Sequence, residues 1–245
     1  MRTKLYLCIL CLMLVCVPCM AENEDWETAF SVPSGEMDPP LAKKTALLCQ
    51  ACYTPVRMQK LLMDMGFDAE SFVQKDYDSD EEHSAGVTFS RKRLTSADGT
   101  CKTLYAVIVR GTMSEQEMIS NFHVGKGDIS AGFDWAAQRV YGHWQDYFAQ
   151  YPPYEGTEYI LWITGHSRGA AVANLLAGVC FPNEVDPERI YAYTFATPNV
   201  QKTTDEKAAV FNFILDGDVV TRVPPAEWGF GRHGTDIHCD QPMMG

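Results

Sequence analysis

The stretch YILWITGHSRGAAVANLLAGVC, from Tyr159 to Cys180, decides the fold. It opens with an apolar run over Ile160–Thr164, which predicts a buried β-strand, and closes with small residues over Ala170–Val179, which predict a helix. Between the two lies the pentapeptide G-H-S-R-G, with Ser167 at its centre. The sequence therefore predicts a sharp turn from a strand to a helix, with a serine at the corner.

A serine at such a corner is suited to nucleophilic catalysis. Hydrolysis of an ester or amide needs an activated oxygen nucleophile, a base that deprotonates it and donors for the developing oxyanion. The strained turn lifts the serine hydroxyl clear of the sheet, and Gly165 and Gly169 leave room for the neighbouring strand and helix. Chance would produce G-x-S-x-G roughly 0.06 times in a chain of this composition. We predict that Ser167 is the nucleophile; the alternative is a glycine-rich turn that packs against a core.

The oxyanion donors are expected at two positions. The first is the N–H after the nucleophile, on Arg168, and the second should come from a loop that follows an earlier strand. The triplet Arg110-Gly111-Thr112 directly follows a predicted strand over 102–109. Its glycine would let the backbone approach closely, and Thr112 can offer both its N–H and its hydroxyl.

Four motifs in this order resemble those of the class 3 (fungal lipase-like) lipases of the α/β-hydrolase superfamily, and most closely their bacterial relatives. They are VIVRGT, ITGHSRGAAVANLLAG, TFATPNV and DGDVVTRVPP, and the likeness covers roughly residues 40–235. The resemblance implies an α/β-hydrolase fold, with a mostly parallel central sheet and helices on both faces. It implies a carboxylic-ester hydrolase that needs neither metal nor cofactor. It also implies that Thr112 and Arg168 form the oxyanion hole and that Asp218 is the acid of the catalytic triad.

The position of Asp218 also favours this role independently of the family. It lies just past the carboxyl end of a predicted strand over 210–215, where sheets of this kind place their catalytic groups. An acid there would orient a histidine and stabilise the imidazolium. Asp216 is the nearby alternative, and turn formation by Asp-Gly-Asp would explain both carboxylates without catalysis.

The catalytic histidine is the part of the triad that the sequence leaves open. The order in this fold is Ser, Asp, His, so the base should follow Asp218. Only His233 and His238 do so, and relatives place the base further along, after additional secondary structure. We therefore expect the base downstream of residue 245, in a chain that is incomplete at its C-terminus, with His238 and then His233 as alternatives. His166, inside the turn, is expected to point away from the serine and to pack.

The remaining sequence alternates predicted strands and helices, which indicates an α/β layered fold. The Asp98-Gly99 pair predicts a hairpin turn, and buried parallel strands are expected after the serine turn. Predicted helices cover 41–53, 56–65 and 133–151; predicted strands cover 86–93, 102–109, 189–195 and 210–215.

The N-terminus has the pattern of a secretory signal. Arg2 and Lys4 precede an apolar run over Leu5–Val17, and cleavage is expected after Ala21. We predict a signal peptide over 1–21, an extended arm over 22–40 and a class 3 lipase-like domain over 41–245. The apolar run is too short to span a bilayer, so the mature protein is expected to be secreted, without a membrane segment. Acylation of Cys19 is the alternative.

Charge and cysteine content narrow the function. The net charge is −12, and loss of the two basic residues of the signal makes it −14. Such a surface repels nucleic acids and anionic headgroups, so a neutral substrate is expected. Cys49-Gln-Ala-Cys52 is expected to carry buried helix thiols rather than a redox pair. The acidic run over 76–82 fails the spacing of a calcium loop and is expected to be a solvated loop.

The expected substrate is a neutral ester, a glyceride or another lipid, met at a lipid–water interface. A phospholipase or a non-lipid acylesterase would share every motif. A secreted binding protein with a genuinely incomplete triad is the non-enzymatic alternative. The segment from Met113 to Phe122, with apolar residues scattered among charges, is expected to be either a lid or a surface loop.

Overall fold

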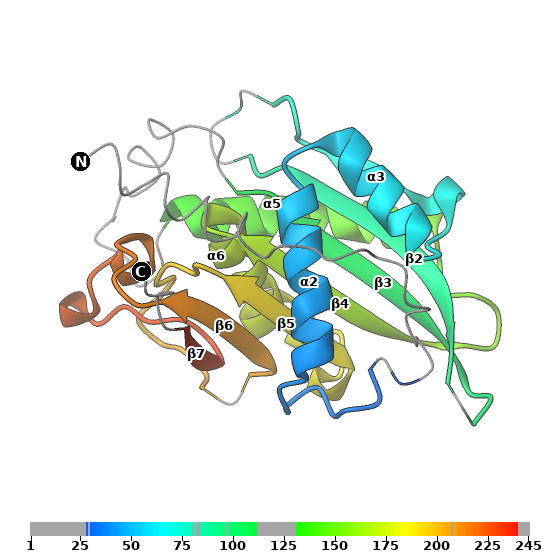
Figure 1. Ribbon diagram of the computed structural model, residues 1–245. Helices are drawn as coiled ribbons and strands as arrows, with labels where there is room; N and C mark the ends of the chain where they lie inside the picture. The colour runs from blue at the N-terminus through cyan, green and yellow to red at the C-terminus, as the bar shows by residue number, and fades with distance from the viewer. Residues whose placement is uncertain are drawn as a thin grey trace, which may run out of the picture.

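The computed structural model describes residue 28 and residues 30–239, except residues 80, 82–83, 97, 112–130 and 207. Within these residues one seven-stranded sheet runs through the molecule in the order β1-β2-β3-β4-β5-β6-β7 (Figure 1). β1 to β3 pair antiparallel, whereas β3 to β7 are parallel to one another. The strands are β1 (Val73–Lys75), β2 (Val87–Thr95), β3 (Cys101–Val109), β4 (Glu158–His166), β5 (Ile190–Phe195), β6 (Val210–Leu215) and β7 (Thr235–Cys239).

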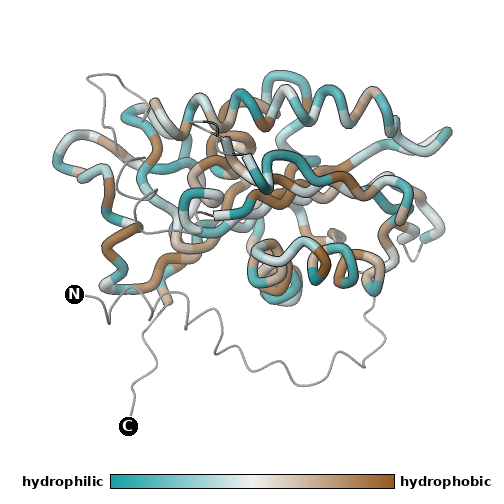
Figure 2. The backbone as a smooth tube through the Cα atoms, turned by 90° about the horizontal axis from the view of Figure 1, so that it is seen from above, coloured by the Kyte–Doolittle hydropathy of each residue, from teal (hydrophilic) through white to brown (hydrophobic). Residues whose placement is uncertain are grey.

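Helices cover both faces of this sheet. α2 (Pro39–Ala51) and α3 (Pro55–Asp64) lie on one face, and α5 (Ala131–Gln150) and α6 (Arg168–Leu175) lie on the other (Figure 1). Figure 2 shows the hydrophobic strands enclosed between the two helical layers. The mostly parallel sheet with helices on both faces is the architecture that the sequence predicts.

The central strand β4 explains why both layers are needed. Leu161 and Ile163 are buried in the cluster on the α5 and α6 face, whereas Trp162 is buried in the cluster on the α2 face. The indole N–H of Trp162 donates to Thr45 Oγ1 of α2 over 2.8 Å. A strand that is apolar on both faces is typical of the centre of a parallel sheet.

The helix boundaries differ from the predicted ones by one to four residues, and two of these differences are informative. α2 begins at Pro39, two residues before the predicted start. Proline is tolerated there because the backbone N–H that it lacks would have no hydrogen-bond partner in the first turn of a helix. α6 ends at Leu175, and the chain continues as one π-helical turn over Leu176–Cys180 instead of as an α-helix to Val179.

The described part of the predicted N-terminal arm packs on the α2 face. The Phe30 ring meets the rings of Trp162 and Tyr191 edge to face, with centroids 5.5 and 5.1 Å apart. The backbone N–H of Asp38 donates to the Tyr193 hydroxyl over 3.1 Å. Burial of aromatic surface therefore holds residues 30–38 against the sheet.

The start of the acidic run is not solvated, and that part of the prediction was wrong. Asp76 has a left-handed backbone with φ of 58° and is mostly buried. The Arg139 guanidinium of α5 donates to both of its carboxylate oxygens, and His143 Nε2 lies 3.1 Å from Oδ2. These hydrogen bonds hold the pKa of Asp76 below its ordinary value, although burial opposes them.

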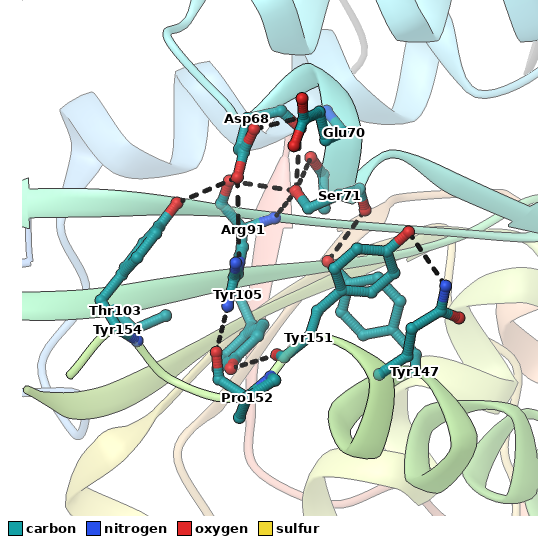
Figure 3. A network of polar contacts seen from close by, with 12 residues as sticks. Asp68, Glu70, Ser71, Arg91, Thr103, Tyr105, Tyr147, Tyr151, Pro152 and Tyr154 are labelled. Atoms are coloured by element: carbon teal, nitrogen blue, oxygen red, sulfur yellow. Dashed lines mark hydrogen bonds and ion pairs between the residues drawn. The ribbon is translucent and has the colours of Figure 1, made fainter.

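A polar network fixes the edge of the sheet far from the carboxyl ends of the strands (Figure 3). Arg91 of β2 donates through its side chain to the Pro152 carbonyl, and its backbone N–H donates to Ser71 Oγ over 3.0 Å. The Tyr105 hydroxyl of β3 donates to the Tyr151 carbonyl over 2.8 Å. These bonds join the end of α5 to β2 and β3.

Cys49 and Cys52 are free thiols and are buried as expected. Burial raises the pKa of the Cys49 thiol to about 12 and so keeps it protonated. No helix of the described residues is long and apolar enough to cross a bilayer.

Candidate active site

The turn at Ser167 carries the strain that its motif predicts. Ser167 has φ of 56° and ψ of −122°, between the end of β4 and the first residue of α6. Its N–H donates to the Phe195 carbonyl of β5 over 2.9 Å, and its own carbonyl accepts from the Ala170 N–H over 2.9 Å. A non-glycine residue keeps this conformation only where its surroundings impose it. The half-buried Ser167 hydroxyl bonds to none of the described residues.

The turn predicted to supply an oxyanion donor begins directly beside this corner, at Arg110 and Gly111. A Cβ on Gly169 would come closer than 3.0 Å to the Val109 and Arg110 carbonyl oxygens, and a Cβ on Gly111 would come closer than 3.0 Å to the His166 carbonyl. The end of β3 and the start of α6 are therefore in backbone contact. Arg168 opens α6 at this contact, where a first-turn N–H has no partner within the helix. Thr112 lies outside the described residues.

The Arg168 side chain points into another part of the structure. It is buried, and its guanidinium donates to the Ser84 carbonyl over 2.6 Å. The loop before β2 therefore binds the Arg168 side chain, and the backbone N–H of Arg168, at the start of α6, is the candidate oxyanion donor.

Asp218 is buried just past the end of β6, with 5% of its surface exposed. Oδ1 accepts from the Val220 N–H over 2.9 Å, and the Asp218 N–H donates to the Leu215 carbonyl over 3.1 Å. Its other oxygen, Oδ2, is buried, and no group among the described residues donates to it. By contrast, Asp216 is 61% exposed and pairs with His238 over 3.1 Å.

The spacing between Ser167 and Asp218 suits an intervening imidazole. β5 alone separates the strands that precede them, and neighbouring strands lie about 4.8 Å apart, so β4 and β6 are about 10 Å apart. A serine, an imidazole and a carboxylate joined by two hydrogen bonds span such a gap.

The sequence profile of the family described as lipase (class 3) matches residues 100–228, more than half of the chain. The chain belongs to the class 3 lipase family. The predicted family is confirmed, and the protein is a lipase-like carboxylic-ester hydrolase.

Solved fungal lipases share the architecture of this class 3 lipase. A fungal lipase in an inhibitor complex, described as a model for interfacial activation in lipases, is 18% identical over 82% of this chain and 80% of its own, with a TM-score of 0.53. A mutant of MDLA from Penicillium cyclopium is 15% identical over 94% of this chain and 84% of its own, with a TM-score of 0.51. These likenesses confirm the α/β-hydrolase fold. No curated protein matches the chain.

No histidine in the described part of the lipase pairs with Asp218. His238, on β7, pairs with Asp216, and β7 lies beyond β6 on the side away from Ser167. His233 is buried, and its Nδ1 accepts from the Asp205 N–H over 3.0 Å. His166 and His143 are bound to Tyr53 and Asp76. His83 and His123 lie outside the described residues.

Two residues to which the sequence assigned no role hold the loop that carries Asp218 in the lipase. Asn199 donates from Nδ2 to the Pro224 carbonyl over 2.7 Å, and its N–H donates to the Val223 carbonyl over 3.0 Å. Arg232 donates to the Thr197 and Thr221 carbonyls. The motif TFATPNV, which contains Asn199, was a signal in the sequence, whereas Arg232 stood in no recognisable pattern.

Gly169→Ala is expected to lower the free energy of unfolding by about 1–3 kcal/mol, because the added methyl would meet the backbone of β3, which cannot move aside. Urea unfolding of the lipase measures the change. Gly142→Ala on α5 is the matched control: a Cβ there meets nothing within 4 Å, so helix propensity should raise stability by about 0.5–1 kcal/mol. Equal stability of the Gly169 variant and the unmodified protein would contradict the close contact.

Proposed function

We propose that this class 3 lipase is a secreted serine hydrolase that cleaves neutral esters, such as glycerides or other lipids, through an acyl-enzyme on Ser167. The Ser167 hydroxyl attacks the ester carbonyl while an imidazole takes its proton. The Arg168 amide and the N–H and hydroxyl of Thr112 donate to the oxyanion. Asp218 orients the imidazole and stabilises its positive charge, and the imidazolium returns the proton to the leaving alcohol. Water then releases the acid by the same steps, and this route needs neither metal nor cofactor.

The observation that carries the proposal is the buried Oδ2 of Asp218, to which no described residue donates. A buried carboxylate oxygen without a donor is costly, because nothing replaces the water that burial removes. An imidazole N–H is the donor that the triad would place there. Purely structural turn formation in Asp-Gly-Asp would use Oδ1 and leaves the burial of Oδ2 unexplained.

The neutral substrate follows from charge. The chain has a net charge of −12, so an anionic substrate would approach against a repulsive field. Ester cleavage at a phospholipid or at a non-lipid acyl group would use the same residues, and rates on glycerides, phospholipids and short acyl esters distinguish the three. We also propose that the protein acts at a lipid–water interface. The segment from Met113 to Phe122, which is expected to be a lid or a surface loop, lies outside the described residues.

We further propose that the base is none of the described histidines. Imidazole added to the solution can then take the place of the missing base. It is expected to raise the rate at which a fluorophosphonate labels Ser167 by at least about tenfold, which is less than the 10²–10⁴-fold rate gain of a positioned base. His238→Ala should leave the labelling rate within about twofold, because this histidine pairs with Asp216.

The outcomes of this experiment are distinct. Rapid labelling that needs no imidazole and disappears in His238→Ala would assign the base to His238 and overturn that part of the proposal. A serine that stays unlabelled with and without imidazole would favour the binding protein and overturn the enzymatic function. Intact mass identifies the modified protein, and Ser167→Ala verifies the site.

A further inference from the structure

The turn after α2 brings one tyrosine against both strand ends of the candidate oxyanion hole. The Tyr53 hydroxyl lies 2.6 Å from His166 Nδ1, and the two rings meet edge to face with centroids 5.9 Å apart. A Cβ on Gly111 would come closer than 3.0 Å to the same hydroxyl oxygen. Gly111 precedes Thr112 after β3, and His166 precedes Ser167 at the end of β4. The phenol oxygen of Tyr53 therefore contacts both Gly111, which precedes Thr112, and His166, which precedes Ser167.

The hydrogen bond between Tyr53 and His166 joins two neutral groups. Burial lowers the pKa of His166 to about 4, so the imidazole is neutral near pH 7. Burial also raises the pKa of Tyr53 above its ordinary value, so the phenol keeps its proton. The hydroxyl can donate to Nδ1 when His166 carries its own proton on Nε2, and the imidazole can donate to the phenol oxygen in the other tautomer. Neither group changes its charge between about pH 6 and 9.

We propose that Tyr53 is a positioning residue, which holds the end of β3 and the end of β4 at the separation that the oxyanion hole needs. The hydroxyl fixes the His166 ring and, through it, the residue before the strained Ser167. Its body fills the space beside Gly111, so the turn that leads to Thr112 cannot move towards α2. The turn after β3 and the start of α6 thereby keep a constant separation, and Tyr53 acts through Gly111 and His166.

This role rests on the proposed function, and the test separates the two. Tyr53→Phe is expected to lower the rate of fluorophosphonate labelling of Ser167, and kcat for a soluble ester, by about tenfold, less than the 10²–10³ that loss of a whole oxyanion donor costs. KM should stay within about twofold, because the displaced donors bind the transition state rather than the ground state. The ratio between variant and unmodified protein should not change between pH 6 and 9.

Tyr191→Phe is the matched control. Tyr191 lies on the same α2 face, where it is buried, and its hydroxyl donates to the Phe30 carbonyl over 3.1 Å, so the substitution removes a comparable bond away from the strand ends. Its labelling rate should match that of the unmodified protein. A slowdown in the Tyr191 variant as large as that in the Tyr53 variant would reduce the effect to lost packing and overturn the inference.

A pair of His166 variants tests the same bond from its other side and does not depend on folding of Tyr53→Phe. His166→Asn can still accept from the phenol and should keep most of the labelling rate, whereas His166→Leu cannot and should lose about tenfold. Equal rates in the two variants would also overturn the inference. If unmodified protein supplied with imidazole is not labelled at all, the proposed function fails. If it is labelled and Tyr53→Phe matches it, only the positioning role fails.

Discussion

Ser167→Ala is expected to lower ester hydrolysis by at least about 10⁴-fold, and to abolish fluorophosphonate labelling, because the acyl-enzyme cannot form without the hydroxyl. The remaining oxyanion donors can only assist direct attack by water, which leaves a small residual rate. Progress curves with a chromogenic ester, with imidazole present throughout, measure the loss.

The folded structure should survive this substitution. The hydroxyl bonds to none of the described residues, and the backbone hydrogen bonds of residue 167 to Phe195 and Ala170 do not involve the side chain. Urea midpoints of the two proteins should therefore agree. Ser96→Ala, in the hairpin turn, is the matched control and should retain full activity. A Ser167 variant that hydrolyses esters at the unmodified rate would show that the strained turn is structural and that the nucleophile lies elsewhere.

The sequence was sufficient for the parts of the molecule that local chemistry determines. G-x-S-x-G between an apolar run and small residues predicts the turn, because only glycine tolerates the backbone contacts found at Gly165 and Gly169. The apolar character of β4 on both faces predicts its central place in a parallel sheet. The Asp-Gly pair at 98–99 predicts the hairpin, and Gly99 has the positive φ, 83°, that the turn requires.

Other features could not be predicted, because they depend on contacts between distant segments. Nothing near Asp76 shows that Arg139, 63 residues later, would neutralise it. Likewise, the Tyr53 hydroxyl meets His166 across 113 residues of sequence, and a tyrosine after a helix has no motif of its own. The base remains open for a different reason: the family pattern fixes its order in the chain but not its position, and the described histidines are all engaged elsewhere.

Asp218→Asn is expected to remove the gain in labelling that added imidazole gives, because the carboxylate no longer orients the ring. If a histidine of the protein is the base instead, the same substitution is expected to lower kcat by about 10⁴-fold. An asparagine is nearly the same size and can still accept from the Val220 N–H through Oδ1. Its amide nitrogen, however, would replace Oδ2 and face the imidazole N–H with another donor, so that the ring loses both its orientation and the charge that stabilises imidazolium.

Asp216→Asn separates this effect from the turn that the two residues share. Asp216 stands two residues earlier in Asp-Gly-Asp, is largely exposed and pairs with His238, so its substitution should change the labelling rate by less than about twofold. Labelling rates with and without imidazole, measured on both variants, decide between them. If both asparagine variants lose the same activity, the loss comes from the turn; if only Asp216→Asn loses it, the acid is Asp216, and His238 becomes the base. A loss confined to Asp218→Asn would show that an imidazole N–H binds the buried Oδ2 of Asp218. An amide has the same shape as the carboxylate, so the substitution should matter only where a donor such as the imidazole N–H needs Oδ2 as its acceptor.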